Sequence, residues 1–379
     1  MKAKLFIVVG TLALVGLGIF LFNRSGESSP AVEPFINQSA IEASDPQKGA
    51  RVSDISVSGT ISVNKIPSNN CLDQGSQDFF CYEEYYEDLT ENEGVTVAFA
   101  DLKERYPKSP YVQSQCHPIT HVIGRAATRI YKTVSEAYSY GDSYCWSGYY
   151  HGILEGVLGK IGRKNLLSQL NQICTDVPGK AEYGFNYYNC VHGLGHGLMA
   201  ITNGELFESL TLCDSLVGEW EQKSCYSGAF MENIIVDGKN HFTKYLKPTE
   251  PLYPCNAVGD KYKGTCYLMQ TSYMLEATRE NFPKVFELCS QVEDTFRPIC
   301  YQSLGRDASG RSISNVVITN YTCNLGLNYE QKSNCVIGAV KDFISYHHSD
   351  VQAKELCNSF TAELREVCLS TTESYYKIF

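Results

Sequence analysis

The sequence lacks the features that identify nucleic-acid-binding proteins and several common enzyme classes. It has no run of lysine or arginine, and its formal net charge is -10. A phosphate backbone binds to a basic face, so this composition argues against a nucleic-acid partner. The motifs C-x-x-C-H, H-E-x-x-H, G-x-S-x-G and the P-loop are all absent. Their absence argues against covalently attached haem, zincin-type proteases, α/β-hydrolases and P-loop nucleotidases.

Charged residues are also missing from one long stretch near the N-terminus. Lys2 and Lys4 precede an apolar run of 18 residues from Leu5 to Phe22, which is just long enough to cross a bilayer as a helix. No A-x-A cleavage pattern follows, so we interpret residues 1–24 as an uncleaved signal anchor whose lysines stay in the cytoplasm. The protein is then a single-pass membrane protein, and the chain after residue 24 is extracytoplasmic.

The rest of the chain divides by composition into a tether and a folded domain. Residues 25–70 are rich in serine, proline, asparagine and isolated charges, which predicts a flexible tether. Hydrophobic residues make up 43% and aromatic residues 12% of the whole chain, which is too apolar for disorder throughout. We therefore predict an extracytoplasmic domain over residues 71–379.

The 16 cysteines follow a regular spacing that predicts the fold of this domain. An even and large number outside the cytoplasm indicates disulfide bonds. Successive neighbouring pairs begin roughly 35 residues apart, a period typical of helical hairpins. The first cysteine of a pair ends one amphipathic stretch and the second opens another. The predicted pairs are Cys174–Cys190, Cys213–Cys225, Cys255–Cys266, Cys289–Cys300, Cys323–Cys335 and Cys357–Cys368, with Cys71–Cys81 and Cys116–Cys145 upstream.

This rhythm predicts an all-α fold of at least six disulfide-stapled helical hairpins, in an α-solenoid or an α/α-toroid. Each bond would join the two helices of one hairpin and stabilise it by about 3 kcal/mol. Cys116 and Cys145 each open a segment that resembles the second helix of such a hairpin.

The stretch "NCVHGLGHGLM" places His192 and His196 four residues apart. On a helix this spacing puts both imidazoles on one face, whereas in a loop the glycines would suggest a backbone nest for an anion. The equivalent segment "CWSGYYHGILEG", which Cys145 opens, has a good helical pattern and favours the helix. The glycines would then let neighbouring helices approach closely.

Three successive second helices each present two metal-ligand residue types at positions i and i+4. In a helical repeat these helices line one surface, so the side chains are expected to converge. A single such histidine is more often a hydrogen-bonded core residue, but five of the eight histidines belong to this set, which favours a shared metal or catalytic site. The pairs are His117 with His121, His151 with Glu155, and His192 with His196.

Imidazoles with a carboxylate suit zinc, iron, copper or manganese, and oxidised cysteines offer no thiolate. Six groups exceed one tetrahedral zinc ion. The sequence leaves open two ions, or one ion with the other groups as acid, base or orienting residues. Met231 follows Cys225 by six residues, as His196 follows Cys190. It fits a core residue better than a copper ligand. The predicted ligands are His117, His121, His151 and His196, and the predicted catalytic acid–base residues are Glu155 and His192.

Positively charged residues follow the second cysteine of later pairs at the same spacing. Arg306 follows Cys300 by six residues, as Lys341 follows Cys335, so both are candidates to bind an anionic or carboxylate-bearing substrate. The alternative is that they belong to a solvated repeat surface. Tyr150 directly precedes the predicted ligand His151 and is the third candidate for substrate binding.

Together these features predict a membrane-anchored extracytoplasmic metalloprotein. We expect a metal-dependent enzyme, an oxidoreductase or a hydrolase, that acts on a small molecule or a peptide. The alternative is a disulfide-stabilised helical-repeat scaffold that binds a protein, peptide or glycan partner without catalysis.

Overall fold

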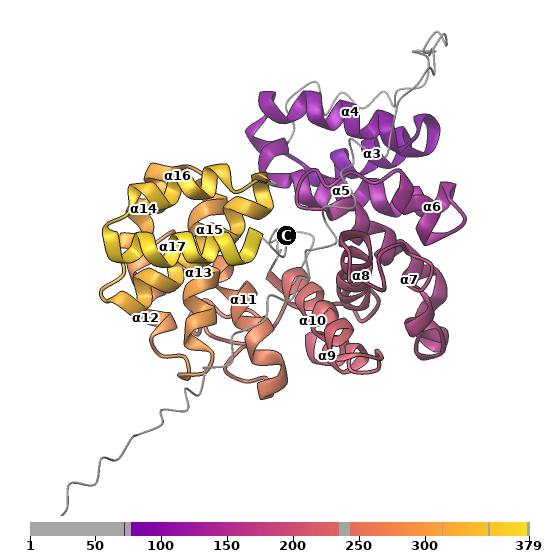
Figure 1. Ribbon diagram of the computed structural model, residues 1–379. Coiled ribbons are helices and arrows are strands. Elements are labelled where there is room, and N and C mark those ends of the chain that lie inside the picture. The colour runs from indigo at the N-terminus through magenta and orange to yellow at the C-terminus, as the bar shows by residue number, and fades with distance from the viewer. Residues whose placement is uncertain (1–71, 73–76, 235–242, 313, 348, 377–379) are drawn as a thin grey trace, which may run out of the picture. The chain divides into compact units, whose positions relative to one another are not determined.

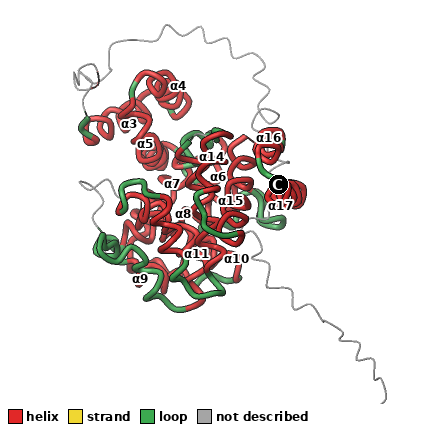
Figure 2. The backbone as a smooth tube through the Cα atoms, turned by 90° about the vertical axis from the view of Figure 1, so that its left-hand side faces the viewer, coloured by secondary structure: helices red, strands yellow, loops and turns green. Residues whose placement is uncertain are grey.

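The described part of the chain consists of helices and the loops that connect them (Figure 1, Figure 2). The computed structural model describes residues 72, 77–234, 243–312, 314–347 and 349–376, all within a unit that spans Phe35–Phe379. They form 15 α-helices and no strand. The prediction of an all-α fold is confirmed for these residues.

The predicted signal anchor, residues 1–24, and the predicted tether, residues 25–70, lie outside the described residues. None of the helices that the structure describes combines the length and the apolar character that a bilayer span requires. The anchor and the tether therefore stay predictions from the sequence.

Long helices contact one another in chain order, each against the next. The contacts run from α5 to α7, α8, α10, α11, α13, α15 and α17, and α3 packs against α5. These neighbours bury one continuous apolar core. The bounds are α3 Phe79–Glu93, α5 Pro110–Ile130, α7 Gly148–Gln169, α8 Phe185–Ile201, α10 Glu219–Ile234, α11 Asp260–Ala277, α13 Arg297–Arg311, α15 Tyr329–His347 and α17 Ala362–Tyr376.

Shorter helices precede most of the long ones. Side chains cap several of them: Asn281 accepts a hydrogen bond from the backbone of Lys284 at the start of α12, and Asn315 does the same for Ile318 in α14. The bounds are α4 Val95–Arg105, α6 Val134–Ser139, α9 Leu206–Cys213, α12 Phe282–Cys289, α14 Val316–Asn324 and α16 Val351–Ser359, with 3-10 helices η3 Tyr106–Lys108 and η4 Leu170–Gln172.

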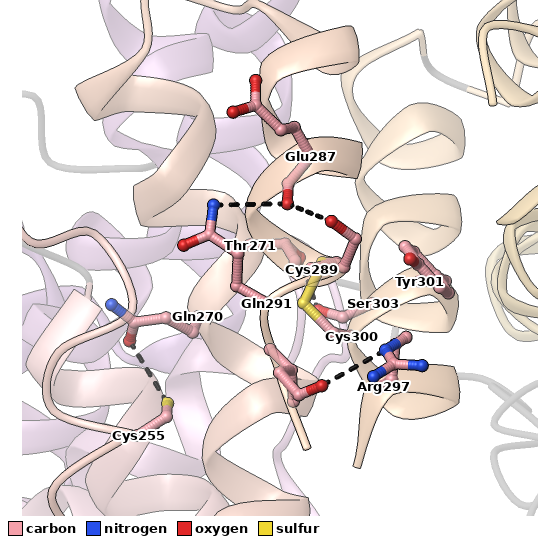
Figure 3. Close-up of a disulfide and its surroundings, with 12 residues drawn as sticks. Cys255, Gln270, Thr271, Glu287, Cys289, Gln291, Arg297, Cys300, Tyr301 and Ser303 are labelled. Carbon is pink, nitrogen blue, oxygen red and sulfur yellow. Dashed lines mark hydrogen bonds between the residues drawn. A yellow bond between two sulfur atoms is a disulfide. The ribbon is translucent and has the colours of Figure 1, made fainter. Parts of the chain in front are cut away.

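Most of the described disulfide bonds join a short helix, or the loop in its place, to the long helix that follows, whereas Cys116–Cys145 joins α5 to the loop before α7. Figure 3 shows the Cys289–Cys300 bond between α12 and α13. No described cysteine is free. Cys81 is disulfide-bonded, and its predicted partner Cys71 lies outside the described residues. The other predicted pairs are confirmed: Cys116–Cys145, Cys174–Cys190, Cys213–Cys225, Cys255–Cys266, Cys289–Cys300, Cys323–Cys335 and Cys357–Cys368.

The turns after α8, α11 and α13 have the same construction. Gly204, Glu280 and Ser314 have φ angles of 74°, 60° and 53°, and each donates its backbone N–H to the carbonyl five residues earlier. This bond is typical of a Schellman C-cap, in which a left-handed residue ends the helix. Three long helices thus end in one geometry.

Glycines set the spacing between the helices that position the histidines. A Cβ atom at Gly195 in α8 would overlap the backbone oxygen of Cys225 in α10, and one at Gly228 would overlap that of His192. Gly152 in α7 lies equally close to His121 in α5. The predicted close approach is confirmed at Gly195, which belongs to the histidine stretch, and Gly228 and Gly152 show it too, because no larger residue fits at these positions.

Neither upstream cysteine opens a helix as predicted. Cys116 lies inside α5, which begins at Pro110. Cys145 does not open a helical segment: residues 145 to 147 have left-handed φ angles of 57°, 56° and 62°, and α7 begins at Gly148. Left-handed residues cannot continue a right-handed helix, so the helix starts only after them. The histidine stretch, by contrast, lies wholly within α8, and its predicted helical structure is confirmed.

Candidate metal centre

Five buried histidines come together from α5, α7 and α8. Their exposed fractions lie between 0% for His196 and 8% for His117. Three overlapping sets of side chains have ligand atoms within 4.8 Å of one another, and groups this close can share a metal ion. The sets are His117, His121 and His151; His151, His192 and His196; and His121, Glu155, His196 and Glu232.

We call His117, His121 and Glu155 the first half-site. The Nε2 atoms of the two histidines lie 3.0 Å apart. Nδ1 of His117 lies 2.8 Å from the backbone oxygen of Cys145, and Nδ1 of His121 lies 2.5 Å from Glu155 Oε1. Arg125 donates to the other oxygen of Glu155 at 2.9 Å. Both imidazoles are therefore oriented by a hydrogen-bond acceptor at Nδ1.

His192, His196 and Glu232 form the second half-site. The two Nε2 atoms lie 3.1 Å apart, and Nδ1 of His196 lies 2.7 Å from Glu232 Oε2. Nδ1 of His192 lies 2.7 Å from Ser227 Oγ. Ser227 donates its own proton to the backbone oxygen of Ser224 at 2.8 Å, so it accepts from His192. The second half-site thus repeats the arrangement of the first.

These contacts define the tautomers of the four paired histidines. Carbonyl and carboxylate oxygens only accept hydrogen bonds, and the Ser227 hydroxyl has already donated its proton to Ser224, so Nδ1 of each ring carries a proton and a neutral ring has its lone pair on Nε2. When both rings of a half-site are neutral, their two Nε2 lone pairs face each other with no proton between them. A bound cation relieves this repulsion. Around a tetrahedral ion with bonds of about 2.0–2.1 Å, two nitrogens lie about 3.3 Å apart, close to the separations observed.

His151 lies between the half-sites. Its ring centroid is 5.3 Å from that of His117 and 5.4 Å from that of His121. The distances to His192 and His196 are 4.8 Å and 4.3 Å. Its Nδ1 is buried and has no hydrogen-bond partner among the described residues, which costs about 1–3 kcal/mol unless a ligand binds it.

The electrostatic environment favours the protonation states that bind metal. Burial lowers the pKa of His117, His151 and His192 well below the usual value, and the neighbouring histidines lower it further. Burial alone would raise the pKa of Glu155, but His121 and Arg125 outweigh it and lower the pKa. Neutral imidazoles and an ionised carboxylate are the ligand forms of these side chains.

The sequence did not identify Glu232 as part of the site. It drew attention to the neighbouring Met231 instead, yet Glu232 is the residue that contacts His196. Spacing could have identified it. Glu155 follows His121 by 34 residues, and Glu232 follows His196 by 36.

Two of the predicted substrate-binding residues are engaged in contacts within the protein. The ring of Tyr150 packs edge-on against Tyr138 and Phe185. Arg306, in α13, donates to the backbone oxygen of Leu268 at 2.7 Å and to Asp307 at 3.0 Å. None of these contacts joins Tyr150 or Arg306 to a histidine.

Lys341, the third of these residues, lies on α15 and remains without a compensating charge among the described residues. Its Nζ lies 3.1 Å from Gln302 Oε1 and 5.9 Å from the ring centre of Tyr375. Burial lowers its pKa, and no described charge offsets this effect. Burial also raises the pKa of Tyr188 to about 12, with a further contribution from Tyr375. The Tyr188 hydroxyl lies 3.3 Å from Nδ1 of His192 in the second half-site.

Comparisons with protein-family models, curated proteins and solved structures find no match to this chain. The function is therefore inferred from the chemistry of the site. The structure brings together all six residues predicted to converge, His117, His121, His151, Glu155, His192 and His196, and adds Glu232 to them. These side chains can bind a metal ion.

Proposed function

We propose that the protein is a membrane-anchored extracytoplasmic metalloenzyme with the histidine centre as its active site. The observation that supports this most directly is the pair of facing Nε2 atoms in each half-site, 3.0 Å and 3.1 Å apart. Buried neutral imidazoles in this arrangement suit a cation. A nitrogen-rich site with carboxylates fits zinc, iron, copper or manganese.

The disulfide bonds support the proposed location. Bonds such as Cys213–Cys225 and Cys357–Cys368 persist in an oxidising compartment and are rare in the cytosol. Together with the apolar run of residues 5–22, they favour a single-pass membrane protein with residues 71–379 outside the cytoplasm.

We also propose that the helices form hairpin repeats closed into an α/α-toroid. The identical turns at Gly204, Glu280 and Ser314 support a repeat. The contacts of each long helix with the next, from α5 through to α17, support a continuous array of the kind that closes into a toroid.

When bound, the metal ion supplies Lewis acidity for hydrolysis or, in the case of iron, copper or manganese, redox chemistry. The protein orients the ligands: Glu155 and Glu232 hold the Nδ1 protons of His121 and His196, which increases the basicity of Nε2. Both oxygens of Glu155 are already engaged, so an orienting role suits it better than acid–base catalysis. His192 repeats the environment of His117, which favours a ligand role.

The proposed substrate is a small molecule or peptide that carries a carboxylate or another anionic group. Lys341 is the better of the two candidate cations, because Arg306 already has Asp307 as its partner. An ammonium group that is partly desolvated and unpaired gains most from an incoming anion.

The test is metal content and turnover of the full-length protein in detergent. Zinc, iron, copper and manganese are offered separately, and bound metal is measured by elemental analysis. Oxygen uptake and hydrolysis of carboxylate-bearing esters and peptides are then assayed with His151→Ala, Lys341→Met and, as a control outside the centre, His347→Ala. We expect metal-dependent turnover that His151→Ala abolishes and Lys341→Met weakens through KM. Absence of bound metal overturns the proposal, and bound metal without turnover leaves the binding scaffold.

A further inference from the structure

We propose that the centre binds two metal ions, one in each half-site, with His151 as a ligand available to both. This inference rests on the proposed metal-dependent function. It decides between the two arrangements that the sequence leaves open.

The first argument is that the half-sites are equivalent. Each contains two histidines at i and i+4 whose Nε2 atoms lie 3.0 Å or 3.1 Å apart. In each, the second histidine donates Nδ1–H to a glutamate of the following long helix, Glu155 or Glu232. In each, the first histidine donates to a neutral oxygen, from Cys145 or Ser227. Two copies of one ligand arrangement predict two ions.

The second argument is that each half-site has its own structural support. The first lies between α5 and α7, where Gly152 contacts the backbone of His121. The second lies between α8 and α10, where Gly228 contacts the backbone of His192. Each close helix pair holds its own histidines and its own orienting carboxylate.

The third argument concerns His151. Two histidines alone leave a tetrahedral ion short of protein ligands. His151 completes a set of three with either pair. It is 2% exposed, its Nδ1 has no described hydrogen-bond partner, and it lies within 5.4 Å of all four ring centroids. Once its N–H proton is released to solvent, the imidazolate has a lone pair on each nitrogen, so this one ring can bind both ions.

A single-ion arrangement competes with this proposal. His121, Glu155, His196 and Glu232 also lie within reach of one ion. That arrangement would use both carboxylates as ligands and would leave His117 and His192 with unpaired Nε2 atoms. The two-ion arrangement uses every Nε2 lone pair and keeps each carboxylate at Nδ1, as the structure has it.

The experiment is the zinc stoichiometry of the full-length protein, measured by elemental analysis after saturation with zinc and removal of free ion. We expect about two ions per chain in the wild type, about one in His121→Ala, about one in His196→Ala, and none in the double variant. His347→Ala serves as the control and should keep both ions. Far-ultraviolet circular dichroism and disulfide mapping establish that each variant is folded.

The outcomes separate this inference from the proposed function. One ion in the wild type, lost completely in either single variant, means a single shared site and overturns the two-ion proposal while the metalloprotein remains. No ion in the wild type overturns both. If an alanine variant does not fold, Glu155→Gln and Glu232→Gln replace it, because each keeps the side-chain volume. Each should weaken one zinc-binding step and leave the other within twofold, and weakening of a single common step would refute the proposal.

Discussion

Replacement of Glu232 by glutamine should weaken metal binding without disturbing the fold. The Glu232 side chain is 12% exposed and accepts the Nδ1 proton of fully buried His196 at 2.7 Å. Glutamine keeps the length of the side chain and an oxygen that can accept this proton. The substitution therefore removes the negative charge and leaves the shape of the site.

The size of the effect follows from the role of the carboxylate. An ionised acceptor at Nδ1 makes Nε2 a stronger donor to the metal, and loss of such a partner costs about 10- to 100-fold in metal affinity. This corresponds to about 1.4–2.7 kcal/mol of binding free energy. The effect should concern only the ion bound by His192 and His196.

The assay is competition for zinc between the full-length protein and a chelating dye of known affinity. Glu219→Gln is the matched control, because Glu219 lies on the same helix, is 79% exposed and pairs with Lys223. We expect a Kd within twofold of wild type for this control. A Glu232→Gln protein whose two zinc affinities both equal those of the wild type would show that the carboxylate does not act on a metal ligand.

Three further predictions concern the fold and its stability, measured by urea unfolding. Gly228→Ala should destabilise the protein by about 1–3 kcal/mol, because a Cβ atom there overlaps a backbone oxygen of the facing helix. The control Gly159→Ala, at a glycine with open space around it, should be neutral or stabilising by up to about 1 kcal/mol. Equal losses of stability in both variants would contradict the packing described. Replacing Cys289 and Cys300 together by serine should cost about 3 kcal/mol, and mass spectrometry of the unreduced wild type should recover the peptide that links them; free thiols there would count against the pairing. Burial raises the pKa of Asp342 to about 6, so the free energy of unfolding of the wild type should fall by up to about 3 kcal/mol as pH rises from 4 through 6. Asp342→Asn should lack this fall and be the more stable protein at pH 7. Parallel pH profiles of the two proteins would refute this prediction.

Much of the fold could be predicted from local sequence. Pairs such as Cys289 and Cys300 are 11 residues apart, and so short a separation leaves few ways to connect a helix to the next one. The histidines at i and i+4 were predictable for the same reason, because helical periodicity alone places His192 and His196 on one face. The glycines among them indicated close helix packing before any partner helix was known.

The composition of the centre depended on tertiary structure. Glu232 belongs to it because glycines let α10 pack closely against α8. This packing brings the Glu232 carboxylate into contact with His196, which lies 36 residues earlier in the chain. The spacing of the cysteines could not predict that Arg306 donates a hydrogen bond to α11. It also could not predict that Tyr150 packs against Tyr138. Periodicity tells which residues share a face of one helix. Which faces meet, and which hydrogen-bond acceptor reaches each Nδ1, is decided by long-range packing between helices.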